Sequence, residues 1–113
     1  MNNCIFCKII RGEIPSSKVY ENEKVLGFKD INPAAPTHIL IVPKSHIDSI
    51  DSIDETNCHV LSEIFLAIKT VAAEQGLTDG YRVVSNVGAA AGQTVEHLHF
   101  HILGGRKLSL TMC

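Results

Sequence analysis

Three histidines that alternate with apolar residues are the clearest chemical feature of this chain. His97, His99 and His101 lie in the run GQTVEHLHFHILGG, and an apolar residue follows each of them. On a β-strand successive side chains point to opposite faces, so the three imidazoles would share one face. Neighbouring histidines would then lie ~6.6 Å apart at Cα and the outer pair ~13 Å apart. One metal ion cannot bind all three at the ~2 Å that nitrogen ligands require, so we expect the histidines to have different roles; surface histidines without function are the alternative.

A second pair of reactive residues stands near the start of the sequence. Cys4 and Cys7 form a Cys-x-x-Cys motif, whose spacing brings two sulfurs together at the start of a helix. The motif favours zinc binding over redox chemistry, because a redox pair normally follows a strand in a βαβ unit and this one does not. Two buried free thiols are the alternative. Cys58 and Cys113 have no identifiable partner in the sequence.

The elements that would position these residues are five strands and two helices. The strands are predicted from β-branched and apolar runs at 18–21, 24–30, 37–43, 81–86 and 97–103. A short helix is predicted over 4–11. A long amphipathic helix is predicted from the capping pattern of Ser52 with Glu55, with Asp54 as a competing cap, to a stop at Gly76. The apolar residues between the histidines are expected to pack against the long helix. Because strands and helices do not alternate, the predicted class is α+β with a mainly antiparallel sheet.

Composition limits the possible functions. The 113 residues, 45% apolar and 19% charged, predict one globular domain over 1–113. A net charge of −2 without a lysine or arginine run argues against a nucleic-acid partner. No apolar run approaches the ~20 residues that span a bilayer, so no membrane partner is expected. The first residues lack the apolar core of a secretion signal, and we expect a cytoplasmic protein.

The run HLHFHIL resembles the histidine-triad signature His-φ-His-φ-His-φ-φ, in which φ is apolar. The similarity continues through CKIIRGEIPS, FKDINPAAPTHILIVPKSHI and GYRVVSN, and so covers most of residues 4–106. The chain thus resembles the histidine triad (HIT) superfamily and, within it, the Hint branch of small dimeric purine nucleoside phosphoramidate hydrolases. This resemblance implies a homodimer in which two five-stranded sheets join into one ten-stranded sheet, which would also cover an exposed strand edge.

The resemblance implies a role for each catalytic candidate. His99 would attack the α-phosphorus of a purine nucleoside 5′-phosphoramidate or acyl-nucleotide, and water would release the nucleoside monophosphate from the nucleotidyl–histidine intermediate. An imidazole suits both steps near pH 7, since its ordinary pKa is ~6.5. The backbone carbonyl of His97 would orient this ring. His101, supported by His38, would contact the phosphate. Thr94 stands where many Hint proteins have serine, and its hydroxyl would assist the leaving nitrogen.

The predicted nucleotide site combines apolar residues with a few polar groups. The motif contains no arginine, so the candidates for binding the phosphate are backbone N–H groups of 92–94, the Asn86 amide and the imidazoles. Asp30 resembles the carboxylate that binds ribose hydroxyls. The full predicted set is Ile5, Phe6, Ile9, Phe28, Asp30, Ile31, Asn86, Gly92, Gln93, Thr94, His99 and His101. Without the resemblance, its apolar members are more simply interpreted as core. Asp30 could equally cap a turn, and ordinary turn chemistry is the alternative for Asn86 and Thr94.

The resemblance also completes the metal set. Some superfamily members add two histidines to such a cysteine pair, and here these would be His46 of PKSHI and His97. Together with Cys4 and Cys7 they form a closed set typical of structural zinc. His97 would then bind metal, and His99 would remain for phosphorus. We expect about one zinc per chain and no organic cofactor.

Two alternative functions remain open from the sequence. One is a dinucleoside polyphosphate hydrolase or nucleotidyl transferase of the same superfamily. The other is a nucleotide-binding or protein-interaction module with incidental turnover, although a binder has no need of a nucleophile at position 99. The final run KLSLTMC differs from the tryptophan–proline tail of animal Hint proteins, which reaches across the dimer and affects substrate choice. The leaving group and the choice between adenine and guanine therefore stay open.

Overall fold

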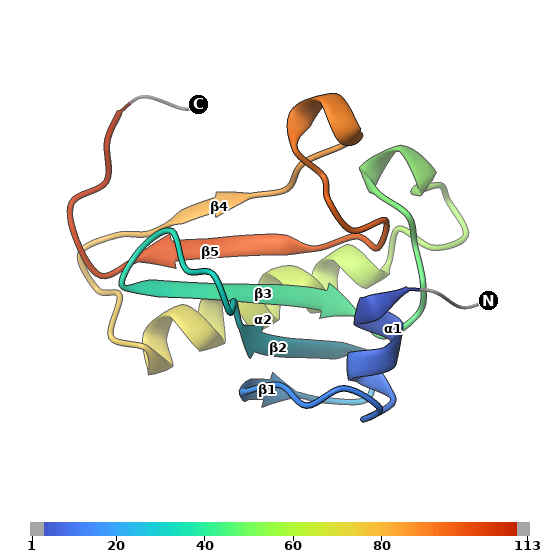
Figure 1. Cartoon of the computed structure of the whole chain (residues 1–113), viewed down its shortest axis with the longest axis horizontal. Coiled ribbons are helices and arrows are strands. Elements are labelled where there is room, and N and C mark those ends of the chain that lie inside the picture. The colour runs from blue at the N-terminus through green and yellow to red at the C-terminus, as the bar shows by residue number, and fades with distance from the viewer. Residues whose placement is uncertain (1–3, 111–113) are drawn as a thin grey trace.

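The fold is an antiparallel sheet with a long helix behind it and a short helix in front of one end (Figure 1). The structure, a computed structural model, describes residues 4–110. Its elements in chain order are α1 (Ile5–Ile10), β1 (Lys18–Glu21), β2 (Val25–Lys29), β3 (Thr37–Pro43), a 3₁₀ turn (Ile50–Ser52), α2 (Val60–Glu74), β4 (Arg82–Val84), a second 3₁₀ turn (Ala89–Ala91) and β5 (Phe100–Gly104). The strand order is β1-β2-β3-β5-β4, and every neighbouring pair is antiparallel. The predicted α+β class is confirmed.

The two faces of the sheet carry separate apolar layers. Because side chains alternate along β2 and β3, one set joins α2 in the main core and the other lies on the opposite face. The members of this second layer are Leu26, Phe28, Leu40 and Val42. Phe6 and Ile9 of α1 pack on it. A helix of six residues is not stable alone, so α1 depends on these contacts and on its cysteines for its position.

The long helix begins later than the sequence predicts. Ser52 belongs to the first 3₁₀ turn, and α2 starts at Val60, so the predicted capping box is wrong. The competing residue Asp54 does not cap α2 either, because His59 stands at the cap position and its side chain makes no capping hydrogen bond. Oδ1 of Asp54 accepts hydrogen bonds from the backbone N–H of Thr56 (2.8 Å) and from the hydroxyl of that residue (2.6 Å). These bonds form a turn ahead of the helix. The predicted stop at Gly76 agrees with the structure, where this glycine has φ of +75° directly after the helix.

The last strand is shorter than predicted, although its side-chain alternation is kept. β5 begins at Phe100, so His97 and His99 precede it. The ladder with β3 ends at the pair Ile41–Phe100. Before that point the Leu98 N–H donates to the carbonyl of residue 47 instead. The apolar residues Leu98, Phe100 and Ile102 are buried in the core with α2, as expected.

Two smaller predictions can be placed on the fold. No helix within the described residues is long and apolar enough to cross a membrane. Cys58 is exposed just before α2, and its sulfur lies 3.9 Å from the carbonyl of Glu55. Cys113 lies outside the described residues.

Candidate active site and metal centre

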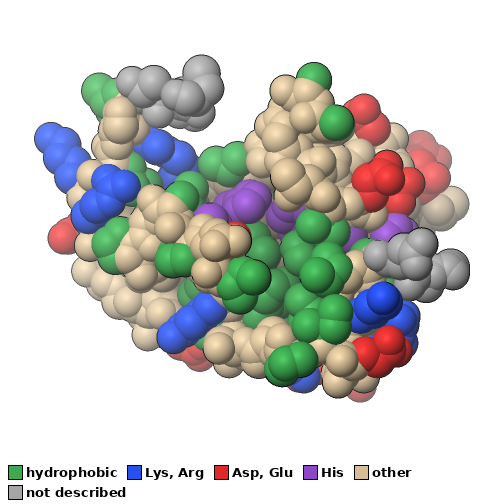
Figure 2. Space-filling model, in the orientation of Figure 1, with side chains coloured by type: hydrophobic (Ala, Val, Ile, Leu, Met, Phe, Trp, Pro, Cys, Tyr) green, Lys and Arg blue, Asp and Glu red, His purple; other side chains and the backbone are tan. Residues whose placement is uncertain are grey.

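A cavity of about 280 Å³ opens on the front of the sheet between α1, β2 and the segment before β5. Figure 2 shows histidine side chains in a hollow on this face, bordered by apolar side chains. The predicted residues that line the cavity are Ile5, Phe6, Ile9, Phe28, Asp30, Ile31, Thr94, His99 and His101. Asn86, Gly92 and Gln93 were predicted with them but do not line it. The cavity thus joins an apolar wall from α1 to a row of imidazoles.

The ring of His99 is held in one tautomer by its neighbour in the sequence. Its Nδ1 lies 2.6 Å from the backbone oxygen of His97, and the residue is only 5% exposed. A carbonyl oxygen accepts hydrogen bonds and cannot donate them, so Nδ1 must carry the proton. In the neutral ring Nε2 is then left with its lone pair. Phe6 meets the ring edge-on, with centroids 5.0 Å apart, and fixes its plane.

His38 and His101 form a directional relay on β3 and β5. The N–H of Ala34 donates to Nδ1 of His38 at 2.9 Å, so the proton of this imidazole is on Nε2. That Nε2 lies 2.9 Å from Nδ1 of His101 and 3.4 Å from a carboxylate oxygen of Asp30. Donation to His101 leaves this residue with a proton on its own Nε2. The relay therefore leaves an N–H donor on His101, whose ring centroid lies 5.1 Å from that of His99.

Both imidazoles of this relay are neutral near pH 7. Burial, and then the positive charges that His99 and His38 would carry, lower the pKa of His101 to about 4. Burial also lowers the pKa of His38, although the nearby Asp30 carboxylate opposes the shift. The Asp30, His38 and His101 ligand atoms lie close enough to hold a metal ion. The hydrogen bonds already match donors with acceptors here, so this group needs no ion.

In the glycine-rich loop before the histidines, two of the three predicted amide donors already bond to carbonyl oxygens of the same loop. The N–H of Gly92 donates to the carbonyl of residue 89, and that of Gln93 to the carbonyl of Gly88. Gly92 has φ of +94°, a backbone conformation that glycine adopts without strain. Of the three predicted amide donors, Thr94 N–H alone makes no hydrogen bond within residues 4–110. The loop thus offers the cavity one amide and the Thr94 hydroxyl.

The buried Gln93 side chain works inside the loop. Its Oε1 accepts from the N–H of Gly88 at 2.8 Å. Its Nε2 donates to the carbonyls of Asp48 at 2.7 Å and Val95 at 3.1 Å. These three hydrogen bonds hold the loop together and tie it to the segment after β3.

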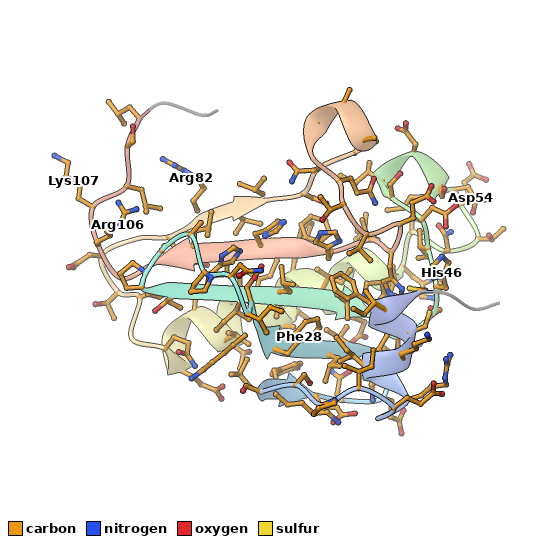
Figure 3. The ribbon with its side chains drawn as sticks, viewed as in Figure 1. Phe28, His46, Asp54, Arg82, Arg106 and Lys107 are labelled. Carbon is orange, nitrogen blue, oxygen red and sulfur yellow. The ribbon has the colours of Figure 1, made fainter. Side chains whose placement is uncertain are left out.

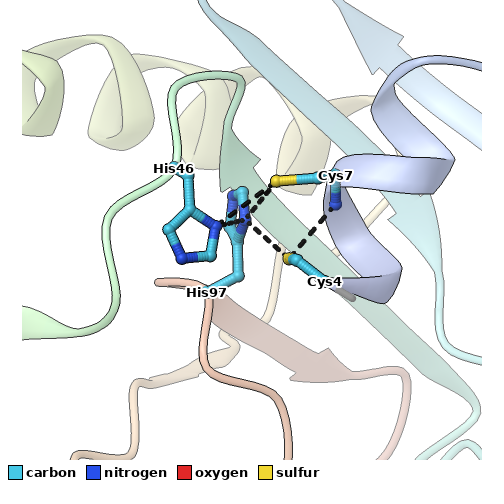
Figure 4. A group of neighbouring side chains, drawn as sticks. All are labelled: Cys4, Cys7, His46 and His97. Carbon is cyan, nitrogen blue, oxygen red and sulfur yellow. Dashed lines mark hydrogen bonds between the residues drawn. The ribbon is translucent and has the colours of Figure 1, made fainter. Parts of the chain in front are cut away.

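A second cluster lies beside the cavity, where the start of α1 meets the end of β3 (Figure 4). It brings together Cys4, Cys7, His46 and His97, as the metal prediction requires. The sulfur of Cys4 lies 3.3 Å from Nδ1 of His97. The sulfur of Cys7 lies 3.3 Å from Nδ1 of His46 and 3.6 Å from that of His97. The two Nδ1 atoms are 3.1 Å apart.

The proton positions show why this cluster suits a cation. Nε2 of His97 is 2.9 Å from the Pro43 carbonyl, and Nε2 of His46 is 2.8 Å from Oδ1 of Asp48. Both Nε2 atoms therefore carry protons, and two bare Nδ1 atoms face each other. Around tetrahedral zinc two nitrogens lie ~3.3 Å apart and a nitrogen and a sulfur ~3.5 Å apart, given bonds of ~2.0 and ~2.3 Å. The observed distances fit zinc, and the Pro43 and Asp48 oxygens orient its ligands.

Several residues of the site were missed from the sequence. Ser85 donates its hydroxyl to the backbone oxygen of His99 at 2.8 Å, a contact that depends on the register of β4 against β5. Lys29 also lines the cavity.

Three basic residues lie at the other end of the sheet from His46 (Figure 3), away from the metal cluster: Arg82, Arg106 and Lys107.

Comparisons with known proteins agree with this geometry. A family profile described as HIT domain matches residues 11–108. The 14 kDa zinc-binding protein of Zea mays is 50% identical over 107 residues, which cover 93% of this chain and 84% of that protein. Protein HitA of Neisseria gonorrhoeae is 47% identical over 104 residues, 92% of this chain and 97% of that protein.

Solved structures resemble the whole fold. A HIT family hydrolase from Clostridium thermocellum has a TM-score of 0.97 and 49% identity, covering 100% of this chain and 99% of that one. A histidine triad protein from Clostridium difficile has a TM-score of 0.92 and 51% identity, with 96% of each chain covered. A histidine triad nucleotide-binding protein from Candida albicans has a TM-score of 0.81 and 38% identity, covering 96% of this chain and 86% of that one.

Proposed function

Because this chain belongs to the HIT domain family, whose solved members include proteins named as hydrolases, we propose that it hydrolyses purine nucleoside 5′-phosphoramidates and acyl-nucleotides to the nucleoside monophosphate. One observation carries the proposal. His99 donates its Nδ1–H to the His97 carbonyl, which leaves Nε2 as the nitrogen free to attack, and the residue lines a cavity that also contains apolar side chains and the Asp30 carboxylate. A metal-free nucleophile with a fixed lone pair is what attack on phosphorus requires.

The first step forms a bond from Nε2 of His99 to the α-phosphorus and breaks the bond from phosphorus to the leaving nitrogen. The ring becomes a cation in this step, and the His97 carbonyl at 2.6 Å stabilises it by accepting the Nδ1–H. The Thr94 hydroxyl, on a residue that lines the cavity, gives a proton to the leaving nitrogen. Water then forms a bond from its oxygen to phosphorus and breaks the bond from phosphorus to Nε2 of His99. A proton of that water replaces the one that Thr94 gave, and His99 is free to attack again.

Charge on the phosphate oxygens is met by hydrogen-bond donors. The His101 Nε2–H and the Thr94 N–H both belong to residues that line the cavity. Preorganised donors in a partly enclosed site stabilise developing negative charge more than they would in water. The nucleoside would lie along the apolar wall of Phe6, Ile9 and Phe28. Asp30 would accept hydrogen bonds from the ribose hydroxyls.

We assign one structural zinc to Cys4, Cys7, His46 and His97. The support is the pair of facing Nδ1 atoms, the fit of the distances to tetrahedral zinc and the similarity to a protein named as zinc-binding. The bound metal would join the start of α1 to the segments after β3 and before β5. It supplies no group to the reaction.

We also propose a cytoplasmic homodimer joined through β4. This strand is the edge of the sheet next to β5, and Tyr81 and Val83 leave apolar surface exposed there. Phe65 and Leu66 of α2 are exposed as well, at 51% and 61%. Pairing of two β4 edges would satisfy unpaired backbone groups and cover these side chains.

The test uses a fluorogenic adenosine phosphoramidate with wild-type protein and His99→Ala. We expect turnover by wild type and a loss of at least ~1000-fold in the variant, the size typical of removing a nucleophile. His59→Ala, which removes an exposed histidine outside the cavity, is the matched control and should retain full activity. Equal rates from wild type and His99→Ala would exclude the mechanism. Tight AMP binding without turnover would favour the binding module, and turnover of dinucleoside polyphosphates alone would favour the related hydrolases.

A further inference from the structure

We propose that the zinc cluster of Cys4, Cys7, His46 and His97 not only joins α1 to the sheet but also positions the walls of the nucleotide cavity. In this view the cluster sets both the affinity for a nucleotide and the orientation of the His99 ring. The role rests on the proposed function for the nature of the ligand and the reaction. Its physical basis is three separate connections between the two sites.

The first connection runs through α1. Within residues 4–13, every hydrogen bond to the rest of the described chain involves the sulfur of Cys4 or Cys7. Phe6 lies between these two cysteines, and its ring meets that of His99 edge-on with centroids 5.0 Å apart. So short a helix does not hold its own position. Ligation of the two sulfurs therefore decides, together with apolar packing, where this wall of the cavity lies.

The second connection lies within a single residue. The ring of His97 directs Nδ1 at the cluster and Nε2 at the Pro43 carbonyl, 2.9 Å away. Its backbone oxygen is the acceptor that holds Nδ1 of His99 at 2.6 Å. His97 is 0% exposed, so the ring and the carbonyl cannot shift independently in the packed interior. Fixing the ring by a metal bond thus fixes the group that orients the nucleophile.

The third connection runs from His46 to the glycine-rich loop. Nε2 of His46 bonds Oδ1 of Asp48, and the Asp48 carbonyl accepts from Nε2 of Gln93 at 2.7 Å. Oε1 of the same Gln93 amide accepts from the N–H of Gly88. One buried side chain therefore links the loop that carries a metal ligand to the loop that presents Thr94 to the cavity.

The experiment compares the full-length zinc-loaded protein with Cys4→Ser/Cys7→Ser. Two quantities are measured: the Kd for AMP by calorimetry, and the Nδ1–H signal of His99 by NMR on protein labelled with ¹⁵N-histidine. Loss of groups that orient a site commonly costs 10–100-fold, so we expect the Kd for AMP to rise at least ~10-fold. We also expect the His99 Nδ1–H signal to disappear, because its acceptor is no longer fixed. If the zinc stabilised only its own surroundings, neither the Kd for AMP nor the His99 Nδ1–H signal would change.

Three further variants separate a loss of positioning from a loss of folding. His46→Gln removes one ligand from an exposed loop and serves if the double variant does not fold. His46→Cys keeps four zinc ligands but loses the bond from His46 to Asp48, so it should bring back the His99 signal and most of the affinity for AMP that His46→Gln loses. Cys58→Ser makes the same chemical change at an exposed cysteine outside the cluster and should change nothing. Circular dichroism checks that each variant is folded.

Three outcomes would overturn this role. One is a folded, zinc-free variant that binds AMP within twofold of wild type and keeps the His99 signal. Another is wild-type protein that takes up no zinc, and the third is failure of His46→Cys to restore either readout while it holds zinc. Failure of the proposed function has a different signature. Wild type would then hydrolyse no phosphoramidate, while the His99 signal still followed the zinc content.

Discussion

The two histidine clusters of this protein differ in what their hydrogen bonds leave unsatisfied. In the cluster of His46 and His97, both Nε2 atoms donate to protein oxygens, so two bare nitrogens face each other at 3.1 Å beside two sulfurs. In the relay, the Ala34 N–H donates to His38 and the N–H of His38 donates to His101, so the N–H of His101 is left for the cavity. The first arrangement suits a cation, and the second suits an anion. In both clusters the partner of one ring nitrogen determines what the other nitrogen can bind.

The largest expected effects come from removing the zinc and from removing the His99 ring. Removal of zinc by a chelator should lower the thermal midpoint by at least ~10 °C, because a ligand at a thousandfold its Kd adds about 4 kcal/mol to the free energy of unfolding. His99→Ala should retain wild-type zinc content and a midpoint within a few degrees, measured by metal analysis and calorimetry. Zinc loss in His99→Ala would show that the metal cluster depends on the His99 ring.

The donors around the phosphate should give the next largest effect. Thr94→Val keeps the shape of the side chain but removes its hydroxyl, and we expect kcat to fall ~100-fold with little change in Kd for AMP. Thr94→Ser keeps the hydroxyl and is the matched control. Equal kcat values for the valine and serine variants would exclude a role for the hydroxyl.

The acid side of the stability profile should report on His101. Its pKa is about 4 in the folded protein and near 6.5 in an unfolded chain, so the unfolded state takes up the proton first as the pH falls. The free energy of unfolding should therefore decrease between pH 6.5 and 4. His101→Asn, whose side-chain oxygen can still accept from His38, should lose less over this range in urea titrations at matched zinc content. Parallel profiles for the two proteins would contradict this assignment.

The smallest expected effect concerns Ser85. Ser85→Ala removes the hydrogen bond to the His99 carbonyl and should lower the free energy of unfolding by about 1 kcal/mol. Because the same peptide carries the nucleophile, the hydrolysis rate should also fall a few-fold. Ser62→Ala, on an exposed position of α2, is the control. A rate loss in both variants, or in neither, would remove Ser85 from the site.

Most of the fold could be predicted because the strands are local patterns. The alternation around His97, His99 and His101 identified which side chains face the core even though β5 begins only at Phe100. The start of α2 was mispredicted because Ser52 and Asp54 are both good caps in isolation. In the structure both residues belong to turns ahead of the helix, and α2 begins after His59 without a side-chain cap.

The sequence by itself determined the cysteine pair, the row of three histidines and the apolar residues that could form a wall, because these follow from residue types and short spacings. The choice of His46 and His97 for metal and of His99 for phosphorus came from the resemblance to the histidine triad superfamily. The tertiary structure decided which nitrogen of each imidazole is bare. For His97 this depends on the Pro43 carbonyl, 54 residues away in the chain, and for His101 on His38, 63 residues away. His46 and His99 use oxygens only two residues away, of Asp48 and His97, and the backbone conformation brings these into reach. The structure also decided that Gln93 binds its own loop and not the cavity. The alternation of side chains along a strand does not encode these contacts, because they depend on how the backbone turns and packs.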